Sequence, residues 1–400
     1  MDAAYTAPPE VGRFQQLSLI VGVVCLALVG VGVAVTRNYE LFFRSYLTAY
    51  VFWIGIALGS LAVLMLQHLT GGAWGLVSRR VLESAAQTIP LMLVLFVPLA
   101  LGIHVLYEWS HPHEVAADPV LAHKARYLVP WFFLVRAGVY FAIWLALSYL
   151  LNKWSGDQDR TADRGISRRF RLLSGPGLVL FVLTVTFASF DWVMSLDPHW
   201  YSTVFGLLFV AGWGLSAFAF VIAALVWLST RKPLQGVVAP SHFHDLGKLL
   251  LAFVMVWAYL SFSQYLIIWS GNIPEEARWY LHRQRGGWGV VAVLLISFQF
   301  ALPFLLLLSR DLKRNARLLA GVAGLVLFMR LVDLFWLIAP EVPKTAGHHL
   351  NISWMDVLAP VGLGGIWLWF FATRLKKRPL LPFNDPYLED AIEQGARHGH

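Results

Sequence analysis

The chain has 400 residues, of which 58% are hydrophobic and only 14% are charged, and its mean hydropathy is +0.63. Soluble domains carry about a quarter charged residues and under half apolar residues, so the composition excludes an ordinary soluble protein and predicts an all-α polytopic membrane protein. The formal net charge of +8 indicates basic loops at one membrane face rather than a nucleic-acid partner.

The chain contains a single cysteine, Cys25, within an apolar stretch. An intrachain disulfide, a thiolate-ligated iron–sulfur cluster and a Cys-based zinc site all need more thiols than this. The sequence also lacks a CxxCH motif, which covalent attachment of a c-type haem requires. We therefore predict a chain without these centres.

About ten apolar stretches are long enough to cross a hydrocarbon core about 30 Å thick. The predicted spans lie at 17–35, 45–69, 84–107, 129–151, 174–195, 202–229, 246–270, 287–309, 315–338 and 353–374. The first follows Arg13 as a signal peptide would, but it is too long for one and no small-residue cleavage site follows it. It is therefore predicted to be a retained anchor.

Lys and Arg residues outside the spans gather mainly on the face that holds both termini, which predicts that both termini are cytoplasmic. The predicted organisation is a cytoplasmic N-terminal segment, transmembrane helices 1–4, a basic cytoplasmic loop, transmembrane helices 5–10 and a cytoplasmic tail, with boundaries at 1–16, 17–151, 152–173, 174–374 and 375–400. The loop is expected to be solvated and partly flexible, and no convincing repeat relates the two sets of helices.

The most informative stretch is 187–206, FASFDWVMSLDPHWYSTVFG, which ends one predicted span and begins the next. Asp191 lies inside the first of these spans, on the same helical face as Ser195. Asp197 and His199 follow in the short turn between the spans. An ionisable group within a span is costly and is a functional hypothesis by default.

Further polar residues lie towards the predicted outer side of other spans: Arg136, His104, Gln264, Arg330 and Asp333. Arg330 and Asp333 are three residues apart and can pair on one helix, so a packing pair is as good an interpretation as a site. His104 fits a hydrogen-bonded packing residue better than a ligand. Asp191 and Arg136 have no partner on their own helices, which favours a function.

A second group of polar residues lies towards the predicted cytoplasmic side, and it comprises Gln67, His68, Glu83, Gln87, His242, His244, Asp245 and Lys248. Lys248, Glu83 and Gln67 are near enough to the interface to extend into the headgroups. Two polar groups with an apolar belt between them predict either two aqueous half-channels or one outer site with an ordinary inner rim.

Ligation of a b-type haem by two histidines needs both of them at one depth in the membrane. His68 and His104 lie at opposite sides, so no b-type haem is predicted.

Tryptophan is abundant, with 18 residues, and many lie near predicted span ends. Examples are Trp109, Trp131, Trp192, Trp200, Trp269 and Trp288. This distribution is typical of the aromatic belts at the two membrane interfaces, so these residues are predicted to be interfacial anchors.

The stretch ASFDWVMSLDPHWYSTVFG resembles the signature of an integral subunit of bacterial alternative complex III, a quinol:cytochrome c oxidoreductase. That complex has two related membrane subunits of the NrfD/polysulfide-reductase type. The chain is similar to the second and shorter one, quinone-binding subunit 2, in its length, its ten spans and its tail sequence FNDPYLED. The resemblance covers essentially the whole chain, and Asp191, Ser195, Asp197 and His199 match the polar positions of the signature.

The resemblance implies two four-helix bundles plus two further helices, in the bacterial cytoplasmic (inner) membrane. It implies a quinone or menaquinone ligand, with no haem or iron–sulfur cluster in this chain. The implied partners are a related quinol-binding membrane subunit, a molybdopterin-oxidoreductase-like iron–sulfur subunit, multihaem and monohaem c-type cytochromes, and small membrane-anchored subunits.

Three functions follow as hypotheses. The first is a subunit of a quinol-oxidising respiratory complex, without its own redox centre, that contributes to a quinone site, to proton conduction, or to both. Outer carboxylates such as Asp191 or Asp197, or His199, would then accept protons, and the cytoplasmic residues Lys248, His244, Glu83 and Gln87 would be the proton-uptake route. The alternatives are a secondary transporter and a purely structural scaffold. The prolines within the spans do not occupy matching positions of two repeats, which counts against the transporter.

Overall fold

The computed structural model describes residues 5–161, 165–342 and 349–397. Within these residues the chain is helical and no strand occurs. Ten of the helical segments are long and apolar enough to cross a membrane, so the chain is an all-α, multi-pass membrane protein, as its composition predicts.

The first five spans and their connections come from the first half of the chain. The elements are α1 (Pro9–Thr36), α2 (Tyr39–Thr70), α3 (Ala73–Ala86), α4 (Ile89–Leu101), α5 (Ile103–Leu106), η2 (Glu108–Ser110), α6 (Pro112–Ala117), α7 (Pro119–Lys124), α8 (Pro130–Thr161), α9 (Gly165–Trp192) and η3 (Met194–Leu196). The third span consists of α3 and α4 together, with a break between them.

The other five spans follow in the second half. The elements are α10 (Phe205–Ser229), α11 (Pro240–Gly271), α12 (Pro274–His282), α13 (Trp288–Leu294), the π-helical segment η4 (Leu295–Ala301), α14 (Leu302–Leu308), α15 (Arg310–Arg314), α16 (Ala316–Ile338), η5 (Ala339–Glu341), α17 (Trp354–Leu375) and α18 (Leu388–Arg397). The segments α13, η4 and α14 form one span.

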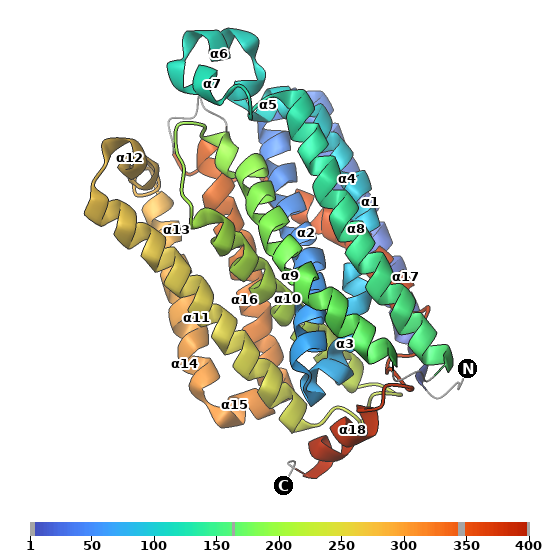
Figure 1. Ribbon diagram of the computed structural model, residues 1–400. Helices are drawn as coiled ribbons and strands as arrows, with labels where there is room; N and C mark the ends of the chain where they lie inside the picture. The colour runs from blue at the N-terminus through green and yellow to red at the C-terminus, as the bar shows by residue number, and fades with distance from the viewer. Residues whose placement is uncertain (1–4, 162–164, 343–348, 398–400) are drawn as a thin grey trace.

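Both termini lie at the same end of the helix bundle, which we call the terminal end (Figure 1). There the backbone N–H of Leu380 donates to the carbonyl of Tyr5 at 2.9 Å, and the rings of Tyr5 and Phe383 are 4.8 Å apart. The short helices α6, α7 and α12 lie at the opposite end, the loop end (Figure 1). A chain that crosses the membrane an even number of times, here ten, must begin and end on the same side.

The spans form one continuous bundle around α2 and α10, which pack against each other. Helix α2 also packs against α17, α3, α9 and α4, and α10 also packs against α16, α11 and α9. Helix α8 contacts α9 and α4, and the span formed by α13, η4 and α14 contacts α11 and α16. Helix α1 packs mainly against α17, which in turn packs against α2.

Small residues allow α1 and α17 to approach closely. A Cβ added to Gly22 would lie 2.7 Å from the backbone nitrogen of Ile366, and one added to Gly365 would lie 2.4 Å from the carbonyl oxygen of Ser18. Close backbone contact at small residues is the usual way in which membrane helices associate. The rest of α1 is largely exposed, as expected for a helix that faces lipid.

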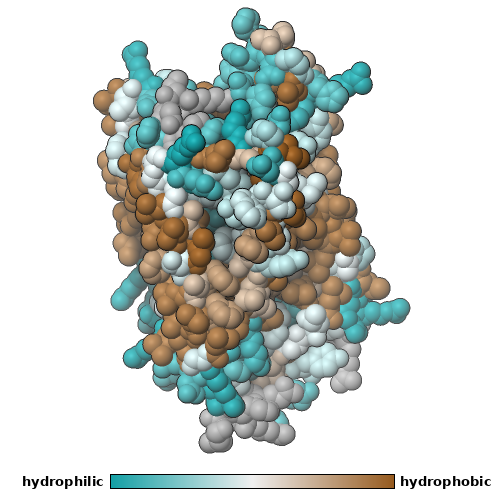
Figure 2. Space-filling model, turned by 90° about the vertical axis from the view of Figure 1, so that its left-hand side faces the viewer, coloured by the Kyte–Doolittle hydropathy of each residue, from teal (hydrophilic) through white to brown (hydrophobic). Residues whose placement is uncertain are grey.

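The surface separates into an apolar belt with polar caps at the two ends (Figure 2). The lengths of the spans agree with this, because the apolar helices extend for 21 to 32 residues and about 20 are enough to cross the hydrocarbon core. Several helices therefore continue beyond the membrane into the polar caps.

Two predictions about the terminal end are wrong in detail. The segment 152–173, predicted to be a flexible basic loop, is mostly helical, because α8 continues to Thr161 and α9 begins at Gly165. The third span begins at Ala73, so Arg79 and Arg80 are buried on a helix instead of lying in a loop. In both places polar side chains are paired within the protein, and hydropathy alone does not reveal this.

Candidate functional site

The site at the loop end is built around the last turn of α9. The helix ends at Trp192, and its free carbonyl groups are capped by side chains from distant segments. The hydroxyl of Tyr107 donates to the carbonyl of Trp192 at 2.9 Å, and the indole N–H of Trp109 donates to the carbonyl of Ser195 at 3.1 Å. Ser195 donates to the carbonyl of Asp191 at 2.5 Å. Ser195 is therefore a backbone cap and does not contact the Asp191 carboxylate.

The carboxylate of Asp191 pairs with Arg136 of α8. Arg136 donates from Nε to Oδ2 and from Nη2 to Oδ1, each at 2.9 Å, and the Tyr140 hydroxyl donates to Oδ2 at 2.8 Å. Asp191 is only 1% exposed. A bidentate pair of this kind is strong and geometrically specific, so the two residues that the sequence left without partners are partners of each other.

Aromatic rings enclose the guanidinium of Arg136. Its Cζ lies 3.8 Å from the ring centroid of Tyr127 and 4.6 Å from that of Phe132, and Nη1 donates to the carbonyl of Tyr127 at 2.8 Å. Stacking of a cation on ring faces strengthens as water is excluded. Tyr127 also lines a cavity, so its side chain contacts the Arg136–Asp191 ion pair and the cavity alike.

This cavity has a volume of about 330 Å³ and lies at the loop end, beside the last turns of α9 and the 193–204 turn. Its polar lining groups are Lys124, Tyr127, Ser195 and Asp197. The rest of the lining is mainly apolar: Leu128, Phe187, Phe190, Met194, Pro198, Trp200 and Tyr201. Phe187 and Tyr201 are exposed on the surface of the bundle, so the cavity opens at the lipid-facing side.

Asp197 and His199 form a short polar chain from the cavity to the surface. Asp197 Oδ1 accepts from the backbone N–H of His199 at 3.1 Å and lies 3.9 Å from His199 Nδ1. His199 Nε2 lies 2.5 Å from Asp118 Oδ2. Asp197 is buried, whereas Asp118 and His199 are partly exposed. The order is therefore cavity, Asp197, His199, Asp118 and solvent.

The His199 contact predicts a pH-dependent loop. The hydrogen bond from His199 lowers the pKa of Asp118 below its ordinary value, and the backbone N–H of Val120 adds to this. An unfolded Asp has a pKa of about 3.9, so the contact contributes its full stabilisation above that pH and loses it as pH falls through the lowered folded pKa. We expect amide hydrogen exchange of residues 112–124 to show an added acceleration below about pH 4.

Hydrogen exchange with mass-spectrometric detection measures this loop effect. Asp118→Asn should lack the added acid-dependent acceleration, because the amide does not titrate. Equal acceleration in the two proteins would show that other groups control the loop.

Several tryptophans predicted to be interfacial anchors are instead buried structural parts of the loop end. Trp200 stacks on Trp279 of α12 with ring centroids 4.4 Å apart, and Arg283 lies 3.4 Å from the Trp279 ring centroid. Trp109, Trp192 and Trp288 are also buried, whereas Trp131 and Trp269 are exposed as predicted.

Gln264 of α11 also belongs to the loop end. It accepts from Ser202 at 2.9 Å and donates to the Tyr280 hydroxyl at 3.1 Å. These contacts fix the end of α11 to the turn after Asp197 and to α12. Gln264 therefore supports the turn from behind and does not line the cavity.

Other predicted site residues lie elsewhere. His104 lines a different loop-end cavity and lies 3.2 Å from the Ser110 hydroxyl through Nδ1. Arg330 and Asp333 pair with each other inside the bundle, against Gly212 of α10. His68 lies at the terminal end, so His68 and His104 are at opposite ends of the molecule.

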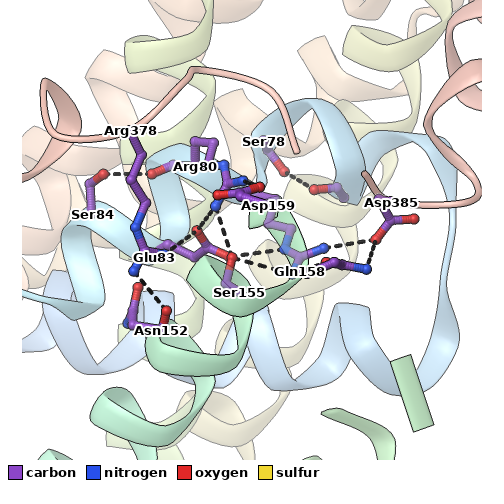
Figure 3. Close-up of polar contacts among 12 residues, drawn as sticks. Ser78, Arg80, Glu83, Ser84, Asn152, Ser155, Gln158, Asp159, Arg378 and Asp385 are labelled. Carbon is purple, nitrogen blue, oxygen red and sulfur yellow. Dashed lines mark hydrogen bonds and ion pairs between the residues drawn. The ribbon is translucent and has the colours of Figure 1, made fainter. Parts of the chain in front are cut away.

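The terminal end contains a buried network of charged residues from α3, α8 and the tail, by which we mean residues 376–397 (Figure 3). Glu83 is at its centre. Its carboxylate accepts from Arg79 Nε at 2.9 Å, from Arg80 Nη1 at 2.7 Å and from Ser155 Oγ at 2.6 Å. Three partners around one carboxylate satisfy it without water.

The outer part of this network ties the tail to the bundle. Arg79 donates to Asp385 at 2.8 Å and to Gln158 at 2.9 Å, and Arg80 pairs with Asp159. Arg378 donates to the carbonyl of Asn152 at 2.7 Å and lies 3.8 Å from Glu83 (Figure 3). The side-chain amide oxygen of Asn152 accepts from Gln87 at 2.6 Å. The three arginines and three carboxylates balance in charge.

The predicted cytoplasmic group is therefore divided. Glu83 and Gln87 belong to the network, whereas Lys248 is 55% exposed and pairs with Asp245 of its own helix at 2.9 Å. His242 accepts from the backbone N–H of Ala239 and contacts the carbonyl of Ala391 at 3.0 Å. Lys248 is a surface residue and gives the proton-uptake hypothesis no geometric support.

Sequence reasoning missed Lys124 and Tyr127 at the loop end, and Arg79, Arg80, Ser155, Asp159 and Asp385 at the terminal end. The helical spacing of Arg79, Arg80 and Glu83 was a usable signal, since residues three and four apart share a helix face. Tyr127 and Lys124 gave no such signal, because they lie in a connecting segment whose path depends on packing.

The sequence matches no model of a known protein family and no curated protein.

Proposed function

We propose that this chain is an integral subunit of a membrane-bound quinol-oxidising respiratory complex, and that it binds a quinone headgroup in the loop-end cavity and conducts the released protons outward. One observation carries this proposal. The cavity opens towards lipid, has a cation and a carboxylate among its lining groups, and is backed through Tyr127 by the buried Asp191–Arg136 pair.

The cavity suits an apolar ring that carries two oxygens. Phe187, Phe190 and Met194 offer apolar walls at the lipid side, where a hydrophobic quinone would approach. Lys124 can donate to a quinone oxygen, and its ammonium already donates to the carbonyl of Pro198 at 2.6 Å. Asp197 can accept from a quinol hydroxyl. Mostly apolar lining with a few placed polar groups is the usual composition of such sites.

Proton release would follow the polar chain away from the cavity. A quinol gives up two protons and two electrons on oxidation to the quinone. Asp197 would accept a proton from the quinol hydroxyl, and His199 and Asp118 would pass it to solvent. Both carboxylate oxygens of Asp191 accept from Arg136, and Oδ2 also accepts from Tyr140. In this proposal Asp191 therefore holds Arg136, Tyr140 and thereby Tyr127 in place and does not carry protons itself.

The electrons would pass to a redox centre in a partner subunit. The sequence lacks the thiols and paired histidines for such a centre, and its resemblance to the second membrane subunit of alternative complex III supports partners with iron–sulfur clusters and c-type haems. The ten candidate spans and the close pairing of α1 with α17 support the same proposal. The loop end would be the outer side, because the basic residues gather at the terminal end.

Proton conduction from the terminal side is the second part of this proposal. The supporting observation is the position of buried Glu83 and half-buried Gln87 in a continuous polar network that reaches Asp159 and Asp385 near the surface. Lys248 and His244 are not part of this network.

A structural scaffold is the competing function, and one observation favours it. The carboxylates of Asp191 and Glu83 each accept three hydrogen bonds from protein side chains, as expected for residues that hold helices together. A transporter receives less support, because the helix breaks lie in the third and eighth spans. If spans 2–5 and 6–9 are compared along the chain, the break is in the second span of the first group and in the third of the other, whereas transporter repeats place such breaks in corresponding positions.

The test begins with gentle purification through a tag on this chain, followed by a redox difference spectrum and subunit masses. Co-purified c-type haem and a large iron–sulfur protein would support the respiratory complex. A colourless chain, alone or with copies of itself, would overturn it.

Within an intact complex, Lys124→Gln should raise the KM for quinol about tenfold, the effect of losing one charge-assisted hydrogen bond. Arg285→Gln removes the same charge at an exposed position outside the cavity lining and should leave the KM unchanged. Equal effects of the two substitutions, or no effect of either, would remove the loop-end cavity from quinone binding.

A further inference from the structure

A second cavity, of about 410 Å³, lies at the terminal end where α2 ends and α3 begins. Its walls come from the α2–α3 turn, the start of α9 and the tail. Thr70, at the end of the α2 span, lines it and is exposed, so the cavity lies at the depth of the lipid headgroups. The proposed quinone site does not use it, although Arg79 and Asp385 of the terminal-end network form part of its wall.

The start of α3 faces this cavity without a side-chain cap. Gly71 and Gly72 both have positive φ, at +73° and +106°, and the helix that follows has 14 residues and no side-chain hydrogen bond to its first turn. Gly72 and Ala73 line the cavity. Uncapped N–H groups at a helix N-terminus attract anions, phosphate above all.

Two polar side chains that line the same cavity, buried Gln67 and half-buried His68, each have a buried atom without a hydrogen-bond partner among the described residues. Gln67 is 5% exposed, and its Oε1 has no hydrogen-bond partner in the part of the chain that the structure describes. The same holds for His68 Nε2, whose ring is stacked on Phe170 with centroids 4.2 Å apart. Buried polar groups are normally satisfied. A ligand that carries both hydrogen-bond donors and acceptors would satisfy these two.

The cavity carries charges of both signs. Arg79 and Arg171 line it together with Asp385 and Asp390. Arg79 and Asp385 already pair with each other at 2.8 Å, whereas Arg171 and Asp390 lie exposed at the rim. A ligand with one anionic and one cationic group would complement this rim. A simple anion would instead leave the carboxylate of Asp390 without an opposite charge and would be repelled by it.

We propose that this cavity binds the headgroup of a zwitterionic phospholipid of the phosphoethanolamine type. The phosphate lies at the α3 N-terminus beside Arg171, and the ammonium lies beside Asp390. Leu69 and Leu76 in the lining give the start of the acyl chains an apolar wall. The tail, which carries Asp390, thereby contacts the bound lipid.

Native mass spectrometry of the purified full-length protein tests this site. Phosphatidylethanolamine, phosphatidylglycerol and inorganic phosphate are added separately and in competition. The wild type should retain phosphatidylethanolamine best. Arg171→Gln and Asp390→Asn should each reduce its retention about tenfold, since each loses one charge-assisted contact. Arg168→Gln is the matched control, because Arg168 is exposed on the same helix and does not line the cavity.

Three results would overturn the proposal. Equal retention by the Arg171 and Arg168 variants would show that the cavity is not the site. Better retention of phosphatidylglycerol than of phosphatidylethanolamine would exclude the amine contact. Displacement of the lipid by inorganic phosphate would identify a site for free phosphate. None of these results depends on quinol turnover.

Discussion

Replacing Glu83 by Gln is expected to cause one of the largest losses of stability that a single substitution can produce in this chain. The carboxylate lies between Arg79 and Arg80 and is 2% exposed. Its loss leaves the three buried or half-buried arginines of the network with only two carboxylates, Asp159 and Asp385, as counter-charges. Breaking a buried ion pair by removing one partner costs about 3–5 kcal/mol. We expect a marked fall in the unfolding midpoint of the purified protein and in the yield of folded protein.

Asp245→Asn is the matched control for Glu83→Gln. Asp245 also pairs with a cation on its own helix, three residues away, but it is 41% exposed. An exposed pair contributes about 0–1 kcal/mol, so this variant should melt close to wild type. Similar melting of Glu83→Gln and Asp245→Asn would contradict the tight coupling of α3, α8 and the tail through Glu83.

Limited proteolysis gives an independent measurement of the same network. Because Asp385 binds Arg79, which Glu83 orients, the Glu83→Gln substitution should also release the tail. Faster cleavage within residues 376–397, at a temperature where the helices remain folded, would link the network to the docking of the tail.

Replacing Asp191 by Asn is expected to lower both stability and quinol turnover. The substitution removes the bidentate pair with Arg136 and the acceptor for Tyr140. The buried guanidinium then lacks its counter-charge, again at a cost of about 3–5 kcal/mol. Tyr127, which stacks on Arg136 and lines the cavity, should lose its fixed position, so a higher KM for quinol is expected along with reduced yield.

A double replacement separates the structural role of the pair from its role at the cavity. In Arg136→Leu with Asp191→Leu, no buried charge is left unpaired, and replacing a buried ion pair with apolar residues is often neutral or stabilising. We expect the double variant to recover much of the unfolding midpoint that Asp191→Asn loses. Turnover of quinol in the assembled complex should stay low, because the guanidinium that stacks on Tyr127 is then absent.

Recovery of both stability and turnover in the double variant would assign the pair to assembly alone and would favour the scaffold. Wild-type turnover and proton release in Asp191→Asn would remove Asp191 from the mechanism altogether. The two measurements are made on the same preparations, so a failure to assemble is distinguished from a failure to turn over.

The sequence by itself determined the membrane class, the number of spans and the shared side of the termini. These properties follow from local hydropathy, because a helix that crosses the bilayer must satisfy its backbone internally and present apolar side chains for about 20 residues. The sequence also identified Asp191 and Arg136, since an ionisable residue inside an apolar stretch stands out in the sequence alone.

Only the tertiary structure decided what these residues contact. Asp191 and Arg136 are 55 positions apart, and Asp385 reaches Arg79 across 306 positions. Charged side chains in a low-dielectric interior must find partners, but which partner they find depends on how the helices pack. For the same reason Arg79 and Arg80 read as loop residues, whereas in the fold the tail and α8 supply the opposite charges that allow them to be buried.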